Sequence, residues 1–130
     1  MKLTAPDYLI LIVEDLDRSL QFYTGILGLA LGHRSGEYAQ LDTGTTRLAL
    51  YTRRAMENTL GLALDPPPAK APGFEIGFKV ADVDVAFREL VTAGAVPAVK
   101  PTDRFWGQRT AYVRDPDGHL IELAQDLRGR

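Results

Sequence analysis

A repeat of about half the chain length constrains the fold more than any other feature of this sequence. Four residues recur 67 positions later with the same or a similar type: Val13, Asp15, Asp17 and Leu20 match Val80, Asp82, Asp84 and Phe87. In both copies a short apolar segment leads into an acidic stretch that is typical of a helix start. The sequence therefore predicts one structural unit that is built twice.

Both copies predict the element order β-α-β-β-β. In the first copy, a helix capped by Asp15 follows the first strand and carries Leu16, Leu20, Tyr23 and Leu27 on one face. The four strands expected here are 8–13, 29–34, 37–42 and 47–52. In the second copy Asp82 caps the helix and Gly94 closes it. Its expected strands are 74–80, a short edge strand at 96–99 that contains Pro97, 108–114 and 119–124.

A proline-rich segment separates the two copies. Four prolines lie within residues 65–72, which excludes a helix and a central strand and predicts an extended linker. We expect a single domain over 1–130, with module 1 at about 7–64 and module 2 at about 73–127. Residues 53–64 fit either a short helix or a flap.

Composition excludes several classes of partner. The net charge of −2 gives no electrostatic reason to expect nucleic acid or an anionic membrane. The chain has no cysteine, which excludes disulfides, thiolate metal sites and a cysteine nucleophile. It contains neither a signal-peptide pattern nor an apolar run long enough to span a bilayer, so we expect a cytoplasmic protein.

The two β-α-β-β-β units, with Asp-Pro-Asp-Gly-His-Leu-Ile-Glu-Leu ending the second, resemble the vicinal oxygen chelate superfamily. This superfamily includes glyoxalases, extradiol dioxygenases, fosfomycin-resistance enzymes and bleomycin-resistance proteins. The resemblance extends from Tyr8 to Ala124. It implies an α+β fold in which two tandem modules form a cupped mixed sheet with helices on the outer face. It also implies a homodimer.

In metal-dependent members of that superfamily, two His and one or two Glu bind the metal from the first and last strands of each unit. The matching positions here are Tyr8, Ala49, Glu75 and Glu122. Glu122 alone is the usual ligand type, because Glu75 replaces an expected His and the other two positions depart from the pattern. The resemblance therefore implies an incomplete metal-ligand set.

Strand alternation predicts which side chains face the cavity. We expect this wall to consist of Tyr8, Arg47, Tyr51, Glu75, Lys79 and Glu122, with Thr110 and Tyr112. Two inward carboxylates among tyrosines suit a ligand with amine or guanidine groups and aromatic rings. The structural alternative is that each carboxylate pairs with Arg47 or Lys79. Trp106, next to Phe105, is expected to be a lid or ligand platform, or else to pack at a dimer contact or core edge.

The remaining ionisable residues favour structural roles. His33 and His119 fall outside the ligand positions and are interpreted as surface or packing residues. The acidic segment 115–118 is interpreted as a tight turn rather than a metal site. Glu75 and Glu122 with a phenol can hold Mg(II) or Mn(II) weakly, but Arg47 and Lys79 compete for the same charges. No cofactor is therefore favoured.

We expect a metal-independent small-molecule binding protein of the bleomycin-resistance type. It would sequester an aromatic or cationic ligand at Tyr8, Arg47, Tyr51, Glu75, Lys79, Trp106, Tyr112 and Glu122. The alternative function is enzymatic: a glyoxalase-like lyase or an extradiol-type dioxygenase, with a divalent metal bound by Glu75 and Glu122. A third interpretation is a small-molecule sensor or a subunit that serves another protein.

Overall fold

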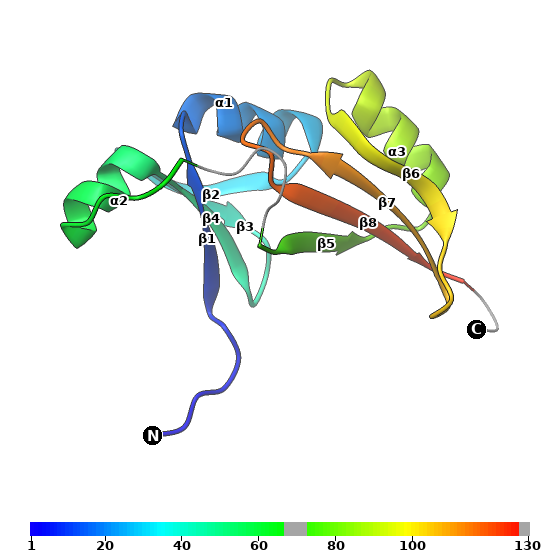
Figure 1. Cartoon of the computed structure of the whole chain (residues 1–130), viewed down its shortest axis with the longest axis horizontal. Helices are drawn as coiled ribbons and strands as arrows, with labels where there is room; N and C mark the ends of the chain where they lie inside the picture. Colours follow the sequence, from blue (N-terminus) through cyan, green and yellow to red (C-terminus); the bar gives the residue numbers. More distant parts are fainter. Residues whose placement is uncertain (67–72, 128–130) are drawn as a thin grey trace. The chain divides into compact units, whose positions relative to one another are not determined.

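Each half of the chain folds into its own four-stranded mixed sheet (Figure 1). The computed structural model describes residues 1–66 and 73–127. The elements of the first half are β1 (Tyr8–Val13), α1 (Leu16–Leu20), the π-helix η1 (Gln21–Ile26), β2 (Ala30–Ser35), β3 (Tyr38–Asp42), β4 (Arg47–Thr52) and α2 (Arg53–Leu60). Those of the second half are β5 (Glu75–Lys79), α3 (Val83–Thr92), β6 (Val96–Asp103), β7 (Gln108–Arg114) and β8 (Leu120–Asp126).

The two sheets have the same topology. Their strand orders are β1-β4-β3-β2 and β5-β8-β7-β6. In both, the first strand lies parallel to the last, and the other pairs are antiparallel. The chain divides into two compact units, Met1–Pro67 and Pro68–Arg130. The predicted α+β fold of two β-α-β-β-β units is therefore confirmed.

Equivalent aspartates begin the first helix of both units, as the repeat predicts. Asp15 has an extended backbone, and its side chain accepts a hydrogen bond from Arg18 N at 3.0 Å. Asp82 accepts in the same way from Val85 N at 3.1 Å. Each carboxylate satisfies a backbone donor that the helix leaves without an intrahelical partner.

The first helix differs from the regular α-helix that the sequence predicts. After Leu20 it widens into η1, where Leu27 N donates to Phe22 O at 2.9 Å, five residues back. Phe22 is buried beside Tyr23 at the start of η1, with their rings edge to face at 5.0 Å. The predicted face is confirmed for Leu16, Leu20 and Tyr23, which are buried, and Phe22 is an additional buried residue that regular helical spacing places outside it.

The helices cover one face of each sheet. In the second unit, Val83 of α3 packs with Ala111 of β7 and Leu123 of β8. In the first unit, Leu11 and Val13 are fully buried, while the intervening Ile12 is only partly buried. This alternation leaves the opposite face of each sheet available for a site.

Several boundaries differ from the sequence expectation. Residues 53–60 form the helix α2, which Thr52 caps by accepting from Ala55 N. The edge strand β6 continues to Asp103 instead of ending at Val99, and two register shifts accommodate its prolines. Of the predicted linker 65–72, residues 67–72 lie outside the described residues.

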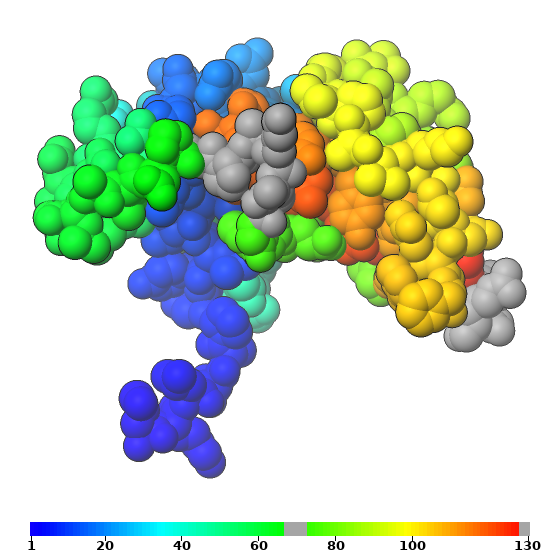
Figure 2. Space-filling model, in the orientation of Figure 1, coloured from blue at the N-terminus to red at the C-terminus, as the bar shows by residue number. Residues whose placement is uncertain are grey.

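The helices in the described residues are short. The longest is α3, with ten residues, and none of the helices in the described ranges has the length and apolar character needed to cross a membrane. The residues before β1 form an arm, dark blue in Figure 2, that stands away from the body of the first unit. All of them are exposed.

Candidate functional site: a carboxyl pair on the second sheet

The register of three strands gathers the candidate acidic site on the uncovered face of the second sheet. β5 lies parallel to β8, which places Gly77 beside Glu122. β7 lies antiparallel to β8, which places Tyr112 on the other side of Glu122. Glu75 precedes Gly77 by two residues and therefore shares this face. The structure thus brings together Glu75, Tyr112 and Glu122 as strand alternation predicts.

The three side chains lie close together. The Tyr112 hydroxyl donates to Glu122 Oε2 at 3.0 Å. The Glu75 carboxyl is near enough to Glu122 for the charge and hydrogen-bonding capacity of Glu122 to raise its pKa. The result is an acidic cluster, defined here as Glu75, Tyr112 and Glu122.

A glycine makes room for the cluster. A Cβ atom on Gly77 would lie 2.8 Å from Glu122 Oε1, closer than atoms in van der Waals contact. The first unit has the opposite arrangement at the equivalent place, where Ile10 pairs with Ala49. The larger side chain of the pair is therefore on the first strand in the first copy and on the last strand in the second copy. Only the second copy accommodates a carboxylate at this place.

The surroundings favour the protonated forms of the Glu75 carboxyl and the Tyr112 phenol. Partial desolvation, the charge of Glu122 and the hydrogen bond with Glu122 together raise the pKa of the Glu75 carboxyl. Desolvation also raises the pKa of the Tyr112 phenol, assisted by its hydrogen bond to Glu122 and by the charges of both carboxylates. The phenol is therefore a hydrogen-bond donor at neutral pH.

Lys79 and Arg47, which the sequence suggests as ion-pair partners of Glu75 and Glu122, form ion pairs with other residues. Lys79 Nζ lies 2.7 Å from Asp126 Oδ2, and Arg47 lies 2.6 Å from Asp7 Oδ2 on the first unit. Among the described residues of the second unit, no Lys, Arg or His forms an ion pair with either carboxylate of the cluster. The predicted pairing of Glu75 or Glu122 with Lys79 was therefore wrong, whereas the pairing with Arg47 of the first unit stays a prediction.

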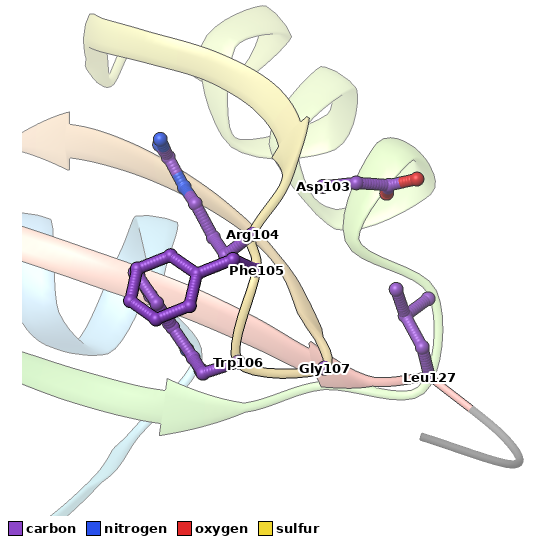
Figure 3. Close-up of a pocket in the computed structure, with 6 residues that line it drawn as sticks. All are labelled: Asp103, Arg104, Phe105, Trp106, Gly107 and Leu127. Carbon is purple, nitrogen blue, oxygen red and sulfur yellow. The ribbon is translucent and has the colours of Figure 1, made fainter.

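Trp106 lies beside the cluster's sheet in the exposed turn between β6 and β7 (Figure 3). Its ring stands edge to face with Phe105 at 5.0 Å, and Phe105 is 97% exposed. Trp106 Nε1 donates to Gln108, Gln108 donates to Asp126, and Asp126 accepts from Lys79. This chain of hydrogen bonds connects two predicted site residues, Trp106 and Lys79, along one face. A hollow of about 470 Å³ lies at the turn.

The other three predicted site residues belong to the first unit. Tyr8, which is 55% exposed, is the register partner of Arg47 on the uncovered face of the first sheet. Tyr51 lies on the same face, and its hydroxyl is 2.9 Å from Thr59 Oγ1 on α2. Ala49, the remaining position that the resemblance implies, is completely buried.

The turn before β8 contains a second group of potential metal ligands. One ligand atom from each of Asp115, Asp117 and His119 lies within 4.8 Å of the others, and all three residues are buried. Asp115 Oδ1 accepts from the backbone N–H groups of Asp117 and His119, at 3.0 and 2.8 Å. Asp115 Oδ2 is hydrogen-bonded to His119 Nδ1 at 2.8 Å. Both carboxylate oxygens of Asp115 thus stabilise the turn through hydrogen bonds, which favours the interpretation of His119 as a packing residue.

Sequence reasoning missed three residues around the cluster. Gln108 and Asp126 connect Trp106 to Lys79, but they are distant in sequence and only the register of β7 and β8 brings them together. Gly77 interrupts the alternation of larger residues in β5, and this small residue was a usable signal. In a strand, a lone glycine often marks a close approach by another group.

The charge of Glu75 should affect stability in a pH-dependent way. A carboxyl whose pKa is raised by folding costs no stability below its unfolded pKa, and the cost is complete above its folded pKa. We therefore expect Glu75→Gln to raise the melting temperature at about pH 8 and to have no effect near pH 4. Thermal melts of both proteins across this range measure the effect. An increase that is equal at both ends of the range would contradict the raised pKa.

Comparison with known proteins agrees with this architecture. The sequence model of the Glyoxalase/Bleomycin resistance protein/Dioxygenase superfamily matches residues 5–123. The uncharacterized protein YraH of Bacillus subtilis is 37% identical over 121 residues, covering 90% of this chain and 94% of YraH. A bleomycin resistance protein of Geobacillus stearothermophilus is 27% identical, covering 89% of this chain and 92% of that protein.

Solved structures show the same similarity. A glyoxalase/bleomycin resistance protein/dioxygenase from Nocardioides superposes with a TM-score of 0.86 at 26% identity, covering 100% of this chain and 88% of the other. The family match spans both β-α-β-β-β units and includes Glu75 and Glu122. The chain therefore belongs to the Glyoxalase/Bleomycin resistance protein/Dioxygenase superfamily.

Proposed function

We propose that this protein binds and sequesters a small aromatic molecule that carries a cationic group, without a metal ion. The observation that carries the proposal is the carboxyl pair of Glu75 and Glu122, which β5 and β8 bring to one face of the second sheet and to which no described cation of that unit is paired. A bound amine or amidine would supply the missing positive charge. Related proteins in this superfamily include one named for bleomycin resistance, which is consistent with a binding role.

The chemistry of the acidic cluster favours a cation. A positively charged group between the two carboxylates would donate to both and favour the ionised form of Glu75. Tyr112 adds a flat ring next to the charge, a surface suited to the aromatic part of a ligand. Its hydroxyl is already used by Glu122, so the phenol positions that carboxylate rather than the ligand.

Carboxylate variants test this proposal. We expect Glu122→Gln to weaken the binding of benzamidine by about 1.5–3 kcal/mol, roughly 10–150-fold, because one hydrogen bond to a charged group is lost. The uncharged isostere benzamide should bind weakly to both proteins. Isothermal titration calorimetry measures the affinities, with tryptamine and bleomycin as further ligands.

Glu89→Gln is the matched control, because Glu89 is an exposed glutamate on α3 of the same unit. It should leave affinity unchanged. Two results would refute the binding-site assignment. One is equal affinity of benzamidine and benzamide, and the other is an unchanged affinity of Glu122→Gln with a clear loss of melting temperature.

The same carboxyl pair supports a second candidate function, a divalent-metal-dependent lyase or dioxygenase. Carboxylate oxygens are the ligands that Mg(II) and Mn(II) prefer, and the pair offers up to four of them. His119, the histidine of the same unit, is hydrogen-bonded to Asp115 instead. Among the described residues of the second unit, the pair therefore lacks the imidazole ligands that Fe(II), Ni(II) and Zn(II) sites commonly use.

Elemental analysis separates the two candidates. Protein purified without a chelator should contain less than stoichiometric metal if the binding proposal is right. One metal ion per chain that is lost in Glu122→Gln would instead favour the enzyme.

We also propose a homodimer. Tyr8 and Leu9 at the start of β1 are 55% and 42% exposed, and Phe74 beside β5 is 51% exposed. β1 and β5 are edge strands of their sheets in the described chain. Apolar residues at a sheet edge are often covered by another chain. Light scattering at micromolar concentration should give twice the chain mass of 14.3 kDa, whereas a monomer mass would contradict the proposal.

A further inference from the structure

The first unit contains a groove that the acidic cluster does not involve. It lies between α2 and the uncovered face of the first sheet, and its volume is about 620 Å³. Ile10 of β1, Tyr38 of β3 and Tyr51 of β4 form its sheet side, and Met56 and Thr59 belong to its helix side. Helix α2 has no buried residue and forms a green lobe at the surface in Figure 2.

The two tyrosines are held in place before any ligand arrives. Tyr38 and Tyr51 are register partners on adjacent strands, and their rings meet edge to face at 5.8 Å. The Tyr38 hydroxyl donates to Gln40 Oε1 at 3.1 Å, and the Tyr51 hydroxyl is hydrogen-bonded to Thr59. Since both hydroxyls have partners, the rings offer mainly apolar surface to the groove.

The charge at the rim of the groove is also satisfied. Glu37 Oε1 accepts from Arg54 and from Thr52, each at 2.9 Å. These bonds lower the pKa of Glu37, which therefore stays an ion paired with Arg54. The groove presents no carboxylate that needs a cation, in contrast to the acidic cluster of the second unit.

We infer that this groove is a binding site for a flat, uncharged aromatic group, held between the Tyr38–Tyr51 pair and the Met56 thioether. Aromatic rings contact such a ligand in edge-to-face or offset geometry, and a thioether contacts a ring edge favourably. The volume lies within the range of about 300–1,000 Å³ that small-molecule sites occupy. All residues that line this groove belong to the first unit, whereas Glu75 and Glu122 belong to the second.

The neutral fluorophore N-phenyl-1-naphthylamine is a suitable probe, because its emission increases in an apolar site. The chain has two methionines, Met1 and Met56, so methyl-labelled methionine gives a two-signal NMR spectrum. We expect saturable fluorescence, together with a ring-current shift of the Met56 methyl signal. The Met1 signal, from a fully exposed residue, should stay in place.

Tyr38→Leu should lower the affinity for the probe at least about tenfold, because leucine keeps an apolar side chain but removes the aromatic ring. Phe105→Leu is the control for non-specific binding to an exposed aromatic side chain, and it should have no effect. Glu89→Gln, at an exposed position of α3, should also leave the probe affinity unchanged. Benzamidine titration of Tyr38→Leu reports on the acidic cluster separately.

Three results would overturn the inference. The first is fluorescence that does not saturate, and the second is fluorescence that saturates while Met56 does not shift. The third is a Met56 shift that depends on protein concentration rather than on the probe, which would assign the groove to contact with a second copy of the chain.

Discussion

Replacing Asp115 by alanine is expected to lower the free energy of unfolding by about 3–5 kcal/mol. Asp115 is 3% exposed, and its two carboxylate oxygens accept from Asp117 N, His119 N and the His119 ring. The alanine variant leaves these buried donors without their acceptor. It also loosens the turn that sets the register of β8, and with it the position of Glu122.

Urea denaturation of the wild type and the variant measures this loss. Asp42→Ala is the matched control, because Asp42 is an exposed aspartate at the end of β3. It should change stability by no more than about 0.5 kcal/mol. If both variants lost the same small amount, the hydrogen bonds of Asp115 would not be structural.

Gly77→Ala is expected to reduce benzamidine affinity as strongly as Glu122→Gln does, by roughly 10–150-fold. The new Cβ would lie 2.8 Å from Glu122 Oε1, so one of the two must move. The carboxylate is the far end of a flexible side chain and moves more easily than the strand. Its hydrogen bonds to Glu75 and Tyr112 should break while the fold is retained.

Gly73→Ala provides the comparison for this substitution. A Cβ on Gly73 would meet no atom within 4 Å, so the variant should bind benzamidine normally. Calorimetric titration and thermal melts of both variants report affinity and stability separately. A Gly77→Ala protein with wild-type affinity would show that the position of Glu122 does not determine binding.

The uncovered face of the second sheet could be predicted from sequence because strand geometry is simple. Side chains alternate with a period of two, so Glu75 and Lys79 of β5 must share a face. The Asp115–Gly118 turn joins β7 to β8 and sets the register that places Tyr112 opposite Glu122. Local signals were therefore sufficient to place Tyr112 beside Glu122, while the parallel pairing of β5 with β8 brings Glu75 to them.

Contacts between distant segments could not be predicted in this way. The ion pairs of Lys79 with Asp126 and of Arg47 with Asp7 join residues 47 and 40 positions apart. The periodicity of a strand predicts which face a charged side chain occupies. It does not predict which oppositely charged side chain on that face forms the ion pair. The expected pairing of Lys79 with Glu75 or Glu122 was wrong for this reason.

The aromatic groove was missed because it needs both a helix and a sheet. Met56 lies in residues 53–64, whose sequence does not distinguish a helix from a flap, and Tyr38 lies in a short alternating strand. Their proximity depends on how α2 packs after its cap at Thr52. The π-helix η1 was missed for a related reason, since burial of both Phe22 and Tyr23 in the folded unit overrides regular helical spacing.

The pH dependence of benzamidine binding tests the central claim most directly. Chelator-treated protein would be titrated by calorimetry between about pH 4 and pH 8, in two buffers with different ionisation enthalpies. A cation that binds the carboxyl pair favours the ionised form of Glu75, whose pKa is raised in the free protein. We therefore predict that affinity rises with pH until Glu75 is ionised in the free protein, with proton release on binding below that point. Affinity that is independent of pH, or binding that appears only after Mg(II) or Mn(II) is added, would contradict metal-independent recognition by Glu75 and Glu122.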